Sequence, residues 1–213
     1  MKTAEVIARL AQLRVIPVMA LEDAADAKPL AEALLAGGLP CAEVTFRTAA
    51  ALESMRAFAQ VPGMLVGAGT VLKPEQAQAA ADAGAQFMVT PGFNPRVVTY
   101  CLSHGLSIVP GISDPTSVEM ALEHGLEVVK FFPAEACGGV KYLKAISAPY
   151  SMMRFIPTGG IEPSNLKSYL AFPKVVACGG TWMVRPELLK EKNWKLVTEL
   201  AREAVELARE VKA

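Results

Sequence analysis

Val128-Val129-Lys130-Phe131-Phe132-Pro133, followed by Ala134-Glu135, is a short apolar run of β-branched and aromatic residues with one lysine in its middle. Such a run predicts a buried strand. Removal from water disfavours the charged ammonium, so a lysine buried there is partly neutral near pH 7 and becomes a nucleophile towards carbonyl groups. The alternative is a lysine near a strand end whose amine reaches water along its aliphatic stem.

The proline that ends this strand belongs to a repeating pattern. Predicted strands end in proline or glycine at five positions, namely Pro91, Pro110, Pro133, Pro157 and Gly179. Successive spacings of 19, 23, 24 and 22 residues suit one strand plus one helix with short loops. Eight such units can be counted, and their strands are apolar on both faces, as in a parallel sheet covered by helices. The sequence predicts a (β/α)8 TIM barrel with an N-terminal helix, in one domain over residues 1–213.

A doubly wound open sheet is the alternative fold. It usually carries a G-x-G-x-x-G motif after its first strand, and this sequence has none there. Two local features are also predicted. We expect a helix over residues 48–60 with Thr48 as its N-cap, and one long amphipathic helix over about residues 187–212.

Composition and charge narrow the classes of function. The chain has 213 residues, of which 52% are hydrophobic and 20% charged, with a formal net charge of +0. This balance argues against nucleic acid or an anionic membrane as the main partner. The four cysteines lack C-x-x-C spacing, which predicts reduced, packed thiols in a cytoplasmic protein. The two histidines each precede a glycine, as at helix ends, and we expect no metal and no cofactor.

The active site of a (β/α)8 barrel lies at the C-terminal ends of its strands. Alternation along the second predicted strand puts Glu43, Thr45 and Arg47 on one face. If that face points inward, a carboxylate and a guanidinium share the barrel mouth with Lys130. The alternative is a structural ion pair of Glu43 and Arg47. The third predicted strand places Thr70 at its tip.

Two glycine-rich turns follow the last two predicted strands. They contain Gly159-Gly160 and Gly179-Gly180-Thr181. Barrels of this class often hold a phosphate at this place, with backbone N–H groups and a short helix N-terminus as donors. The Thr181 hydroxyl would add one more donor. The alternative is a pair of tight turns without a ligand.

The residue types together point to one kind of chemistry. A neutral amine converts a ketone to a protonated imine, which accepts electrons when a nearby C–C bond breaks. Glu43 is the strand carboxylate placed to move protons, and an arginine fork suits a carboxylate on the substrate. These residues predict a metal-independent Schiff-base (class I) aldolase acting on a 2-keto acid with a distal phosphate.

Five blocks of the sequence resemble the 2-keto-3-deoxy-6-phosphogluconate aldolase family. They are EVTFRT (43–48), VGAGTVL (66–72), KFFPAE (130–135), PTGGI (157–161) and GGTW (179–182). The resemblance extends from about Val15 to the final helix. It implies a (β/α)8 barrel, commonly a homotrimer, that acts in the Entner–Doudoroff pathway. Bacterial members are often bifunctional with 4-hydroxy-2-oxoglutarate aldolase.

The resemblance also implies a role for each matching residue. Lys130 corresponds to the Schiff-base lysine, and Glu43 to the general acid/base, which works through a water. Arg47 and Thr70 correspond to the groups that hold the pyruvate carboxylate. The remaining correspondences are Phe132 and Pro91 beside the reacting carbon, Thr158 at a substrate hydroxyl, and Gly159, Gly160, Gly179, Gly180 and Thr181 around the phosphate. Thr181 replaces an expected serine and keeps the hydroxyl, and Cys137 replaces an expected asparagine.

The implied reaction is cleavage of 2-dehydro-3-deoxy-6-phosphogluconate to pyruvate and glyceraldehyde 3-phosphate. A second implied reaction is cleavage of 4-hydroxy-2-oxoglutarate to pyruvate and glyoxylate. Three alternatives stay open at this point. They are a galactonate-series aldolase of opposite C4 configuration, a non-aldolase phosphate-binding barrel such as an isomerase or synthase, and a non-catalytic barrel.

Overall fold

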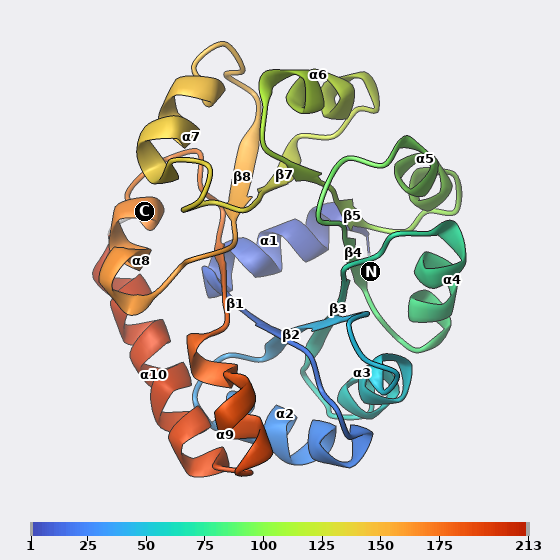
Figure 1. Ribbon diagram of the computed structural model, residues 1–213, viewed down its shortest axis with the longest axis vertical. Coiled ribbons are helices and arrows are strands. Elements are labelled where there is room, and N and C mark those ends of the chain that lie inside the picture. Colours follow the sequence, from blue (N-terminus) through green and yellow to red (C-terminus); the bar gives the residue numbers. More distant parts are fainter. Residues whose placement is uncertain (1, 212–213) are drawn as a thin grey trace.

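The computed structural model describes residues 2–211. Strands and helices alternate along the chain, with the strands inside and the helices outside (Figure 1). The strands are β1 (Val15–Met19), β2 (Cys41–Thr45), β3 (Leu65–Gly69), β4 (Phe87–Val89), β5 (Ile108–Val109), β6 (Gly111–Ile112), β7 (Val128–Phe131), β8 (Arg154–Pro157) and β9 (Cys178–Gly180). Most of their residues are buried, as expected of strands covered on both faces.

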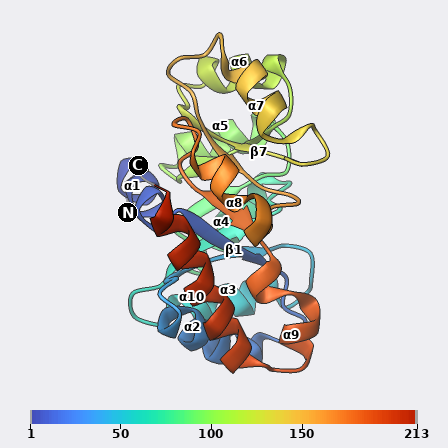
Figure 2. The same cartoon turned by 90° about the vertical axis from the view of Figure 1, so that its left-hand side faces the viewer.

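The helices follow the predicted repeat. Proline occupies the first turn of several of them, where its missing N–H costs no hydrogen bond. The helices are α1 (Thr3–Leu13), α2 (Ala27–Ala36), α3 (Ala51–Ala59), α4 (Pro74–Asp82), α5 (Pro95–Ser103), α6 (Pro115–Glu123), α7 (Gly139–Ser147), α8 (Pro163–Leu170), α9 (Pro186–Lys190) and α10 (Trp194–Glu210), with short 3-10 turns at Ala24–Asp26 and Trp182–Val184. Figure 2 follows α10 along the outside, where it contacts α2 and α8.

Every strand pair is parallel. One sheet has the order β5-β4-β3-β2-β1-β9, and a second has the order β6-β7-β8. Pro110, where a predicted strand ends, separates β5 in the first sheet from β6 in the second and has no N–H to donate. Isolated parallel bridges pair Phe155 with Val175 and Thr158 with Gly179. The protein therefore has an α/β fold with a curved parallel sheet, as predicted at the level of fold class.

Apolar side chains form two layers around the strands. The outer layer packs the strands against the helices and includes Phe58 and Tyr169. The inner layer includes Leu10 of α1, Ile16 and Phe87. Helix α1 thus packs against the inner residues at the N-terminal ends of the strands, and the C-terminal ends are left for polar side chains. Among the described residues, every helix is too short or too polar to span a bilayer.

Two local predictions are wrong. The final segment is two helices, because Lys192 adopts φ 53° between them and Asn193 caps α10 by accepting a hydrogen bond from Leu196 N. Residue 212, the predicted end of that segment, lies outside the described residues. Thr48 does not cap α3, whose N-cap is Ala50. Its hydroxyl instead donates to the carbonyl oxygen of Leu21 at 2.5 Å.

Candidate active site

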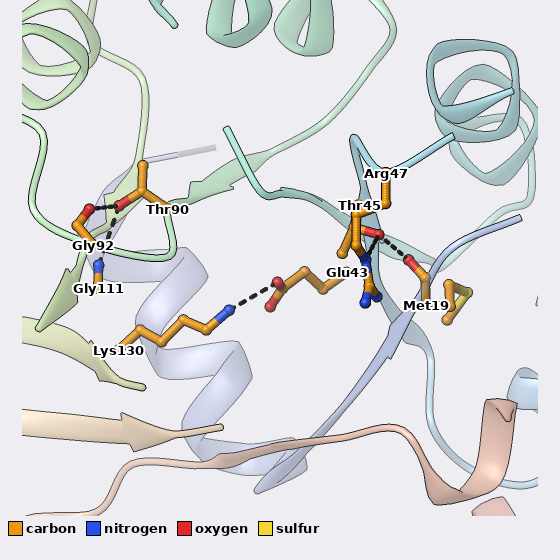
Figure 3. Close-up of polar contacts among 8 residues, drawn as sticks. All are labelled: Met19, Glu43, Thr45, Arg47, Thr90, Gly92, Gly111 and Lys130. Atoms are coloured by element: carbon orange, nitrogen blue, oxygen red, sulfur yellow. Dashed lines mark hydrogen bonds and ion pairs between the residues drawn. The ribbon is translucent and has the colours of Figure 1, made fainter. Parts of the chain in front are cut away.

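Lys130 and Glu43 meet on the inner side of the strands. Lys130 is the third residue of β7 and is 6% exposed, and Glu43 is the middle residue of β2 and is 3% exposed. Their side chains point towards each other, with Lys130 Nζ 3.3 Å from Glu43 Oε1 (Figure 3). The prediction of a buried strand lysine is confirmed, and the alternative of an amine in bulk water is wrong. Two buried charges of opposite sign offset part of each other's desolvation.

The polar face of β2 points inward, as predicted. Thr45 is buried, and its hydroxyl donates to the carbonyl oxygen of Met19 at 2.8 Å. The hydroxyl oxygen of Thr45, Oγ1, also accepts a hydrogen bond from Nε of Arg47 at 2.8 Å (Figure 3). Glu43 pairs with Lys130 and not with Arg47, so the predicted alternative of a Glu43–Arg47 ion pair is wrong.

A second hydroxyl fixes the turn after β4. Thr90 is 1% exposed, donates to the carbonyl oxygen of Gly92 at 2.7 Å, and accepts from the backbone N–H of Gly111 at 3.1 Å (Figure 3). Gly111 is paired in register with Lys130. The turn that carries Pro91 is therefore tied to the strand next to the lysine.

The twelve residues predicted for the site come together around one cavity of about 400 Å³. That volume is in the range of small-molecule sites. The predicted residues that line it are Glu43, Arg47, Thr70, Pro91, Lys130, Phe132, Thr158, Gly159, Gly160, Gly179, Gly180 and Thr181. Sequence reasoning had not assigned four further lining residues to the site: Val18, Thr45, Ile161 and Glu162.

The Lys130 end of the cavity combines an aromatic ring with a strained backbone. The ring centroid of Phe132 lies 5.0 Å from Lys130 Nζ, a distance at which the ring face attracts a cation. Thr70 adopts φ 55°, a conformation that is costly for a β-branched residue. Such strain concentrates at functional sites, where the surrounding structure maintains it.

The two glycine turns form another part of the cavity wall. Gly159 and Gly160 have φ values of 99° and 77°, which residues with a Cβ atom rarely adopt. A Cβ atom on Gly179 would lie 2.4 Å from Oγ1 of Thr158. That hydroxyl is buried and has no hydrogen-bond partner among the described residues. A buried hydroxyl without a partner is costly, which favours a ligand group beside Thr158.

A charged pair stands at the same rim. Glu162 lines the cavity, and its Oε2 lies 2.8 Å from Nη2 of Arg185. Both side chains are about half exposed, so the pair contributes little to stability. Within residues 2–211, no three His, Cys, Asp or Glu side chains gather closely enough to hold a metal ion.

Comparison with known proteins assigns this arrangement to a family. The family described as "Aldolase: KDPG and KHG aldolase" matches residues 6–200. The chain belongs to that aldolase family. A 2-dehydro-3-deoxy-phosphogluconate aldolase of Treponema pallidum is 52% identical over 93% of this chain and 95% of its own.

Two solved aldolase structures resemble this one closely. The 2-keto-3-deoxy-6-phosphogluconate aldolase of Zymomonas mobilis ZM4, solved with 3-phosphoglycerate, has a TM-score of 0.90 and 40% identity, covering 99% of this chain and 98% of its own. The KDPG aldolase of Legionella pneumophila has a TM-score of 0.90 and 38% identity, covering 96% and 98%. It was solved with pyruvate captured as a covalent carbinolamine intermediate.

The geometry of this aldolase also identifies supporting residues that sequence reasoning missed. Two of them are Gly69 and Gly111, each of which faces a side chain or turn of the cavity so closely that a Cβ atom would lie within 2.4 Å of it. Glycine within or beside a strand is a known signal of close approach, and it could have marked these positions. Alternation had placed Thr45 on the inner face of its strand, but the hydrogen bonds of Thr45 with Met19 and of Thr90 with Gly111 join distant segments and gave no signal in the sequence.

Proposed function

We propose that the protein is a class I aldolase that cleaves 2-keto-3-deoxy-6-phosphogluconate to pyruvate and glyceraldehyde 3-phosphate through a Schiff base on Lys130. The observation that carries the proposal is the buried contact of 3.3 Å between Lys130 Nζ and Glu43 Oε1 at the cavity. The carbinolamine of pyruvate in the Legionella aldolase supports the same chemistry here.

Proton transfer between the two side chains begins the reaction. Glu43 takes a proton from the Lys130 ammonium, and the neutral amine attacks the ketone carbon C2 of the substrate. Glu43 then gives that proton to the carbinolamine hydroxyl, which leaves as water, so that a protonated imine forms and Glu43 is a carboxylate again. The contact between the two residues supports this step, since their separation is near hydrogen-bond range.

Cleavage then uses the imine as an electron acceptor. Glu43, acting through a water, removes the proton of the C4 hydroxyl, the C3–C4 bond breaks, and its electron pair forms an enamine. The aldehyde leaves, and the protonated Glu43 returns a proton to C3. Hydrolysis of the imine releases pyruvate and restores Lys130. Glu43 accepts and returns every proton in these steps, so the proposed mechanism uses no metal or cofactor.

Different groups around the cavity bind different parts of the substrate. Arg47 and Thr70 bind the carboxylate, because a guanidinium fork and a hydroxyl match its two oxygens. Phe132 and Pro91 line the reacting carbon, and Thr158 binds a substrate hydroxyl with its unpartnered Oγ1. The phosphate binds at Gly159, Gly160, Gly179, Gly180 and Thr181, where backbone N–H groups and the N-terminus of α8 are donors.

A second substrate follows from the same division. We infer that 4-hydroxy-2-oxoglutarate is cleaved to pyruvate and glyoxylate, since it carries the same keto-acid end. The family description, which includes KHG aldolase, supports this. Assays with both C4 epimers of the phosphorylated substrate test the alternative galactonate series, and faster cleavage of the galactonate epimer would overturn our assignment.

We further propose a complete (β/α)8 barrel in a single domain over residues 1–213, assembled as a cytoplasmic homotrimer. Two observations support eight strands in a ring. β5 and β6 count as one strand broken at Pro110, and the isolated bridges of Phe155 with Val175 and of Thr158 with Gly179 would close the ring between β8 and β9. The four free cysteines suit a reducing compartment. Light scattering should give three times the chain mass of 22.6 kDa, and a monomer mass would overturn the trimer.

Reduction of the imine tests the mechanism directly. The protein is incubated with pyruvate and sodium borohydride, and the labelled peptide is identified by mass spectrometry. We expect one pyruvyl adduct on Lys130, and none in Lys130→Ala or in Lys130→Arg, whose guanidinium stays protonated. Lys144→Ala, a change on α7, is the matched control and should label normally. Absence of an adduct in the unsubstituted protein would favour a non-aldolase or non-catalytic barrel.

A further inference from the structure

Arg47 projects from a short turn that three hydrogen bonds hold in place. The backbone N–H of Phe46 donates to the carbonyl oxygen of Gly69 at 2.9 Å. The hydroxyls of Thr45 and Thr48 donate to carbonyl oxygens of the β1 segment, those of Met19 and Leu21. The turn after β2 is thus fastened to β1 on one side and to β3 on the other.

Only one of these groups also touches the guanidinium. Thr45 Oγ1 accepts from Arg47 Nε at 2.8 Å (Figure 3). A threonine hydroxyl has a single proton, and the proton of Thr45 is directed at Met19. Its lone pairs therefore face the arginine, and the direction of the hydrogen bond is fixed by the fold.

The rest of the guanidinium stays available. Across residues 2–211, the Thr45 contact is the one hydrogen bond of Arg47, and no ion pair involves this side chain. Arg47 is exposed at the cavity, whereas Thr45 is 2% exposed. Without a partner at Nε, an exposed arginine would sample many rotamers, and each loss of rotamer freedom on binding costs affinity.

We propose that Thr45 is a positioning residue that pre-orients the Arg47 guanidinium, so that its two terminal nitrogens face the carboxylate of the 2-keto acid. This assignment deepens the proposed function and rests on it. Thr45 acts through Arg47 and not on the reacting atoms. Its removal should weaken carboxylate binding and leave the chemical step at Lys130 largely unchanged.

The test compares Thr45→Val with Thr48→Val. Both changes replace a hydroxyl that donates to a β1-segment carbonyl with a methyl group of the same shape, but only the first removes the acceptor of Arg47 Nε. The measured quantity is the pyruvate concentration that gives half-maximal borohydride trapping. We expect it to rise about tenfold in Thr45→Val, the size of one hydrogen bond to a charged group, and to stay near the original value in Thr48→Val and Thr45→Ser.

Two further measurements separate orientation from general damage. Pyruvamide lacks the carboxylate charge, so the pyruvamide concentration that gives half-maximal trapping should be the same in Thr45→Val and in the unsubstituted protein. In an Arg47→Ala background, Thr45→Val should have almost no additional effect, because both changes remove the same interaction. If Thr45→Val does not fold, Thr45→Ala is measured in the same cycle.

The outcomes are distinct. Equal effects of Thr45→Val and Thr48→Val, or full additivity of Thr45→Val with Arg47→Ala, would overturn the positioning role while leaving the aldolase mechanism intact. Failure of the unsubstituted protein to trap pyruvate at all would overturn the proposed function and this assignment with it.

Discussion

Glu43 fills space beside Gly69 that no other residue would leave open. A Cβ atom at position 69 would lie 2.4 Å from Oε1 and 2.9 Å from Cγ of Glu43. Gly69 ends β3, and Glu43 lies on the neighbouring strand β2. The position of the carboxylate, and with it the 3.3 Å contact to Lys130, thus depends on a missing side chain on the next strand.

Gly69→Ala should therefore displace Glu43 and lower kcat about 100-fold, because general acid–base catalysis contributes roughly 10²–10⁴-fold and depends on placement. The measurement is the rate of pyruvate release from the phosphorylated substrate. Gly92→Ala is the control, since a Cβ atom there meets nothing within 4 Å. An unchanged kcat in Gly69→Ala would mean that the carboxylate position is not important.

Glu43→Gln keeps the shape of the side chain and removes its ability to carry a proton. We expect kcat to fall by about 10²–10⁴-fold, with loss of the exchange of pyruvate methyl protons in deuterated water, which requires proton transfer at C3. NMR measures that exchange. Glu162→Gln, at a carboxylate that lines the same cavity but pairs with Arg185, is the control and should retain exchange. Normal exchange in Glu43→Gln would assign the proton transfer to another group.

Thr70→Gly should stabilise the fold and weaken the enzyme. The φ of 55° at Thr70 is strained for threonine, and glycine would release that strain. Glycine also has more conformational freedom in the unfolded chain, which lowers stability, and we expect the released strain to exceed this loss by up to about 1 kcal/mol. The KM should rise, because the hydroxyl is lost. Urea unfolding and steady-state kinetics measure the two effects. Thr181 has a φ of −113° and is not strained, so Thr181→Gly is the control and should only lower the free energy of unfolding. Equal changes in stability at both positions would show that Thr70 is not strained.

The N-cap of α6 predicts a stability change with pH. Hydrogen bonds from the backbone N–H and hydroxyl of Ser117, at 3.0 and 2.8 Å, hold the pKa of Asp114 below its usual value. A depressed pKa means that the stabilisation is present above the unfolded-state pKa of about 3.9 and is lost as pH falls through the lower, folded-state value.

At pH 7, Asp114→Ala should lower the free energy of unfolding by about 1 kcal/mol, and Asp114→Asn, which keeps an acceptor for the cap, by less. The difference between Asp114→Ala and the unsubstituted protein should shrink as the pH falls below 3.9. Urea unfolding across pH measures it, and a difference that stays constant with pH would exclude the charged cap as the cause.

Thiol reactivity should single out one cysteine. Burial raises the pKa of the Cys101 thiol to about 11 and those of Cys41 and Cys178 well above their usual range, whereas Cys137 is only half-buried. At pH 8 we expect one rapid reaction per chain with a thiol reagent such as DTNB, because the thiolate is the reacting form. Cys137→Ser should abolish that phase, and a rapid second thiol would contradict the assignment.

Much of the site could be predicted because it depends on local patterns. Period-two alternation placed Glu43 and Arg47 on the inner face, and an apolar run with one lysine placed Lys130 in a buried strand. Other features depend on contacts between distant segments. The Thr45–Met19 bond joins residues 26 apart, and Thr48 donates to Leu21 instead of capping α3. The break between β5 and β6 reflects the missing N–H of Pro110. The division between α9 and α10 reflects the φ of 53° at Lys192 and the cap by Asn193.

The turns around Gly159 and Gly179 carry no lysine or arginine, so the proposed phosphate end relies on backbone dipoles. A buried cation dedicated to the phosphate would be left without a counter-ion whenever an unphosphorylated acid bound, at a cost of several kcal/mol. Backbone N–H groups at an open rim can turn to water instead. The rim would then accept short, unphosphorylated substrates without any change. An enzyme that excludes them would need an additional charged side chain at this rim.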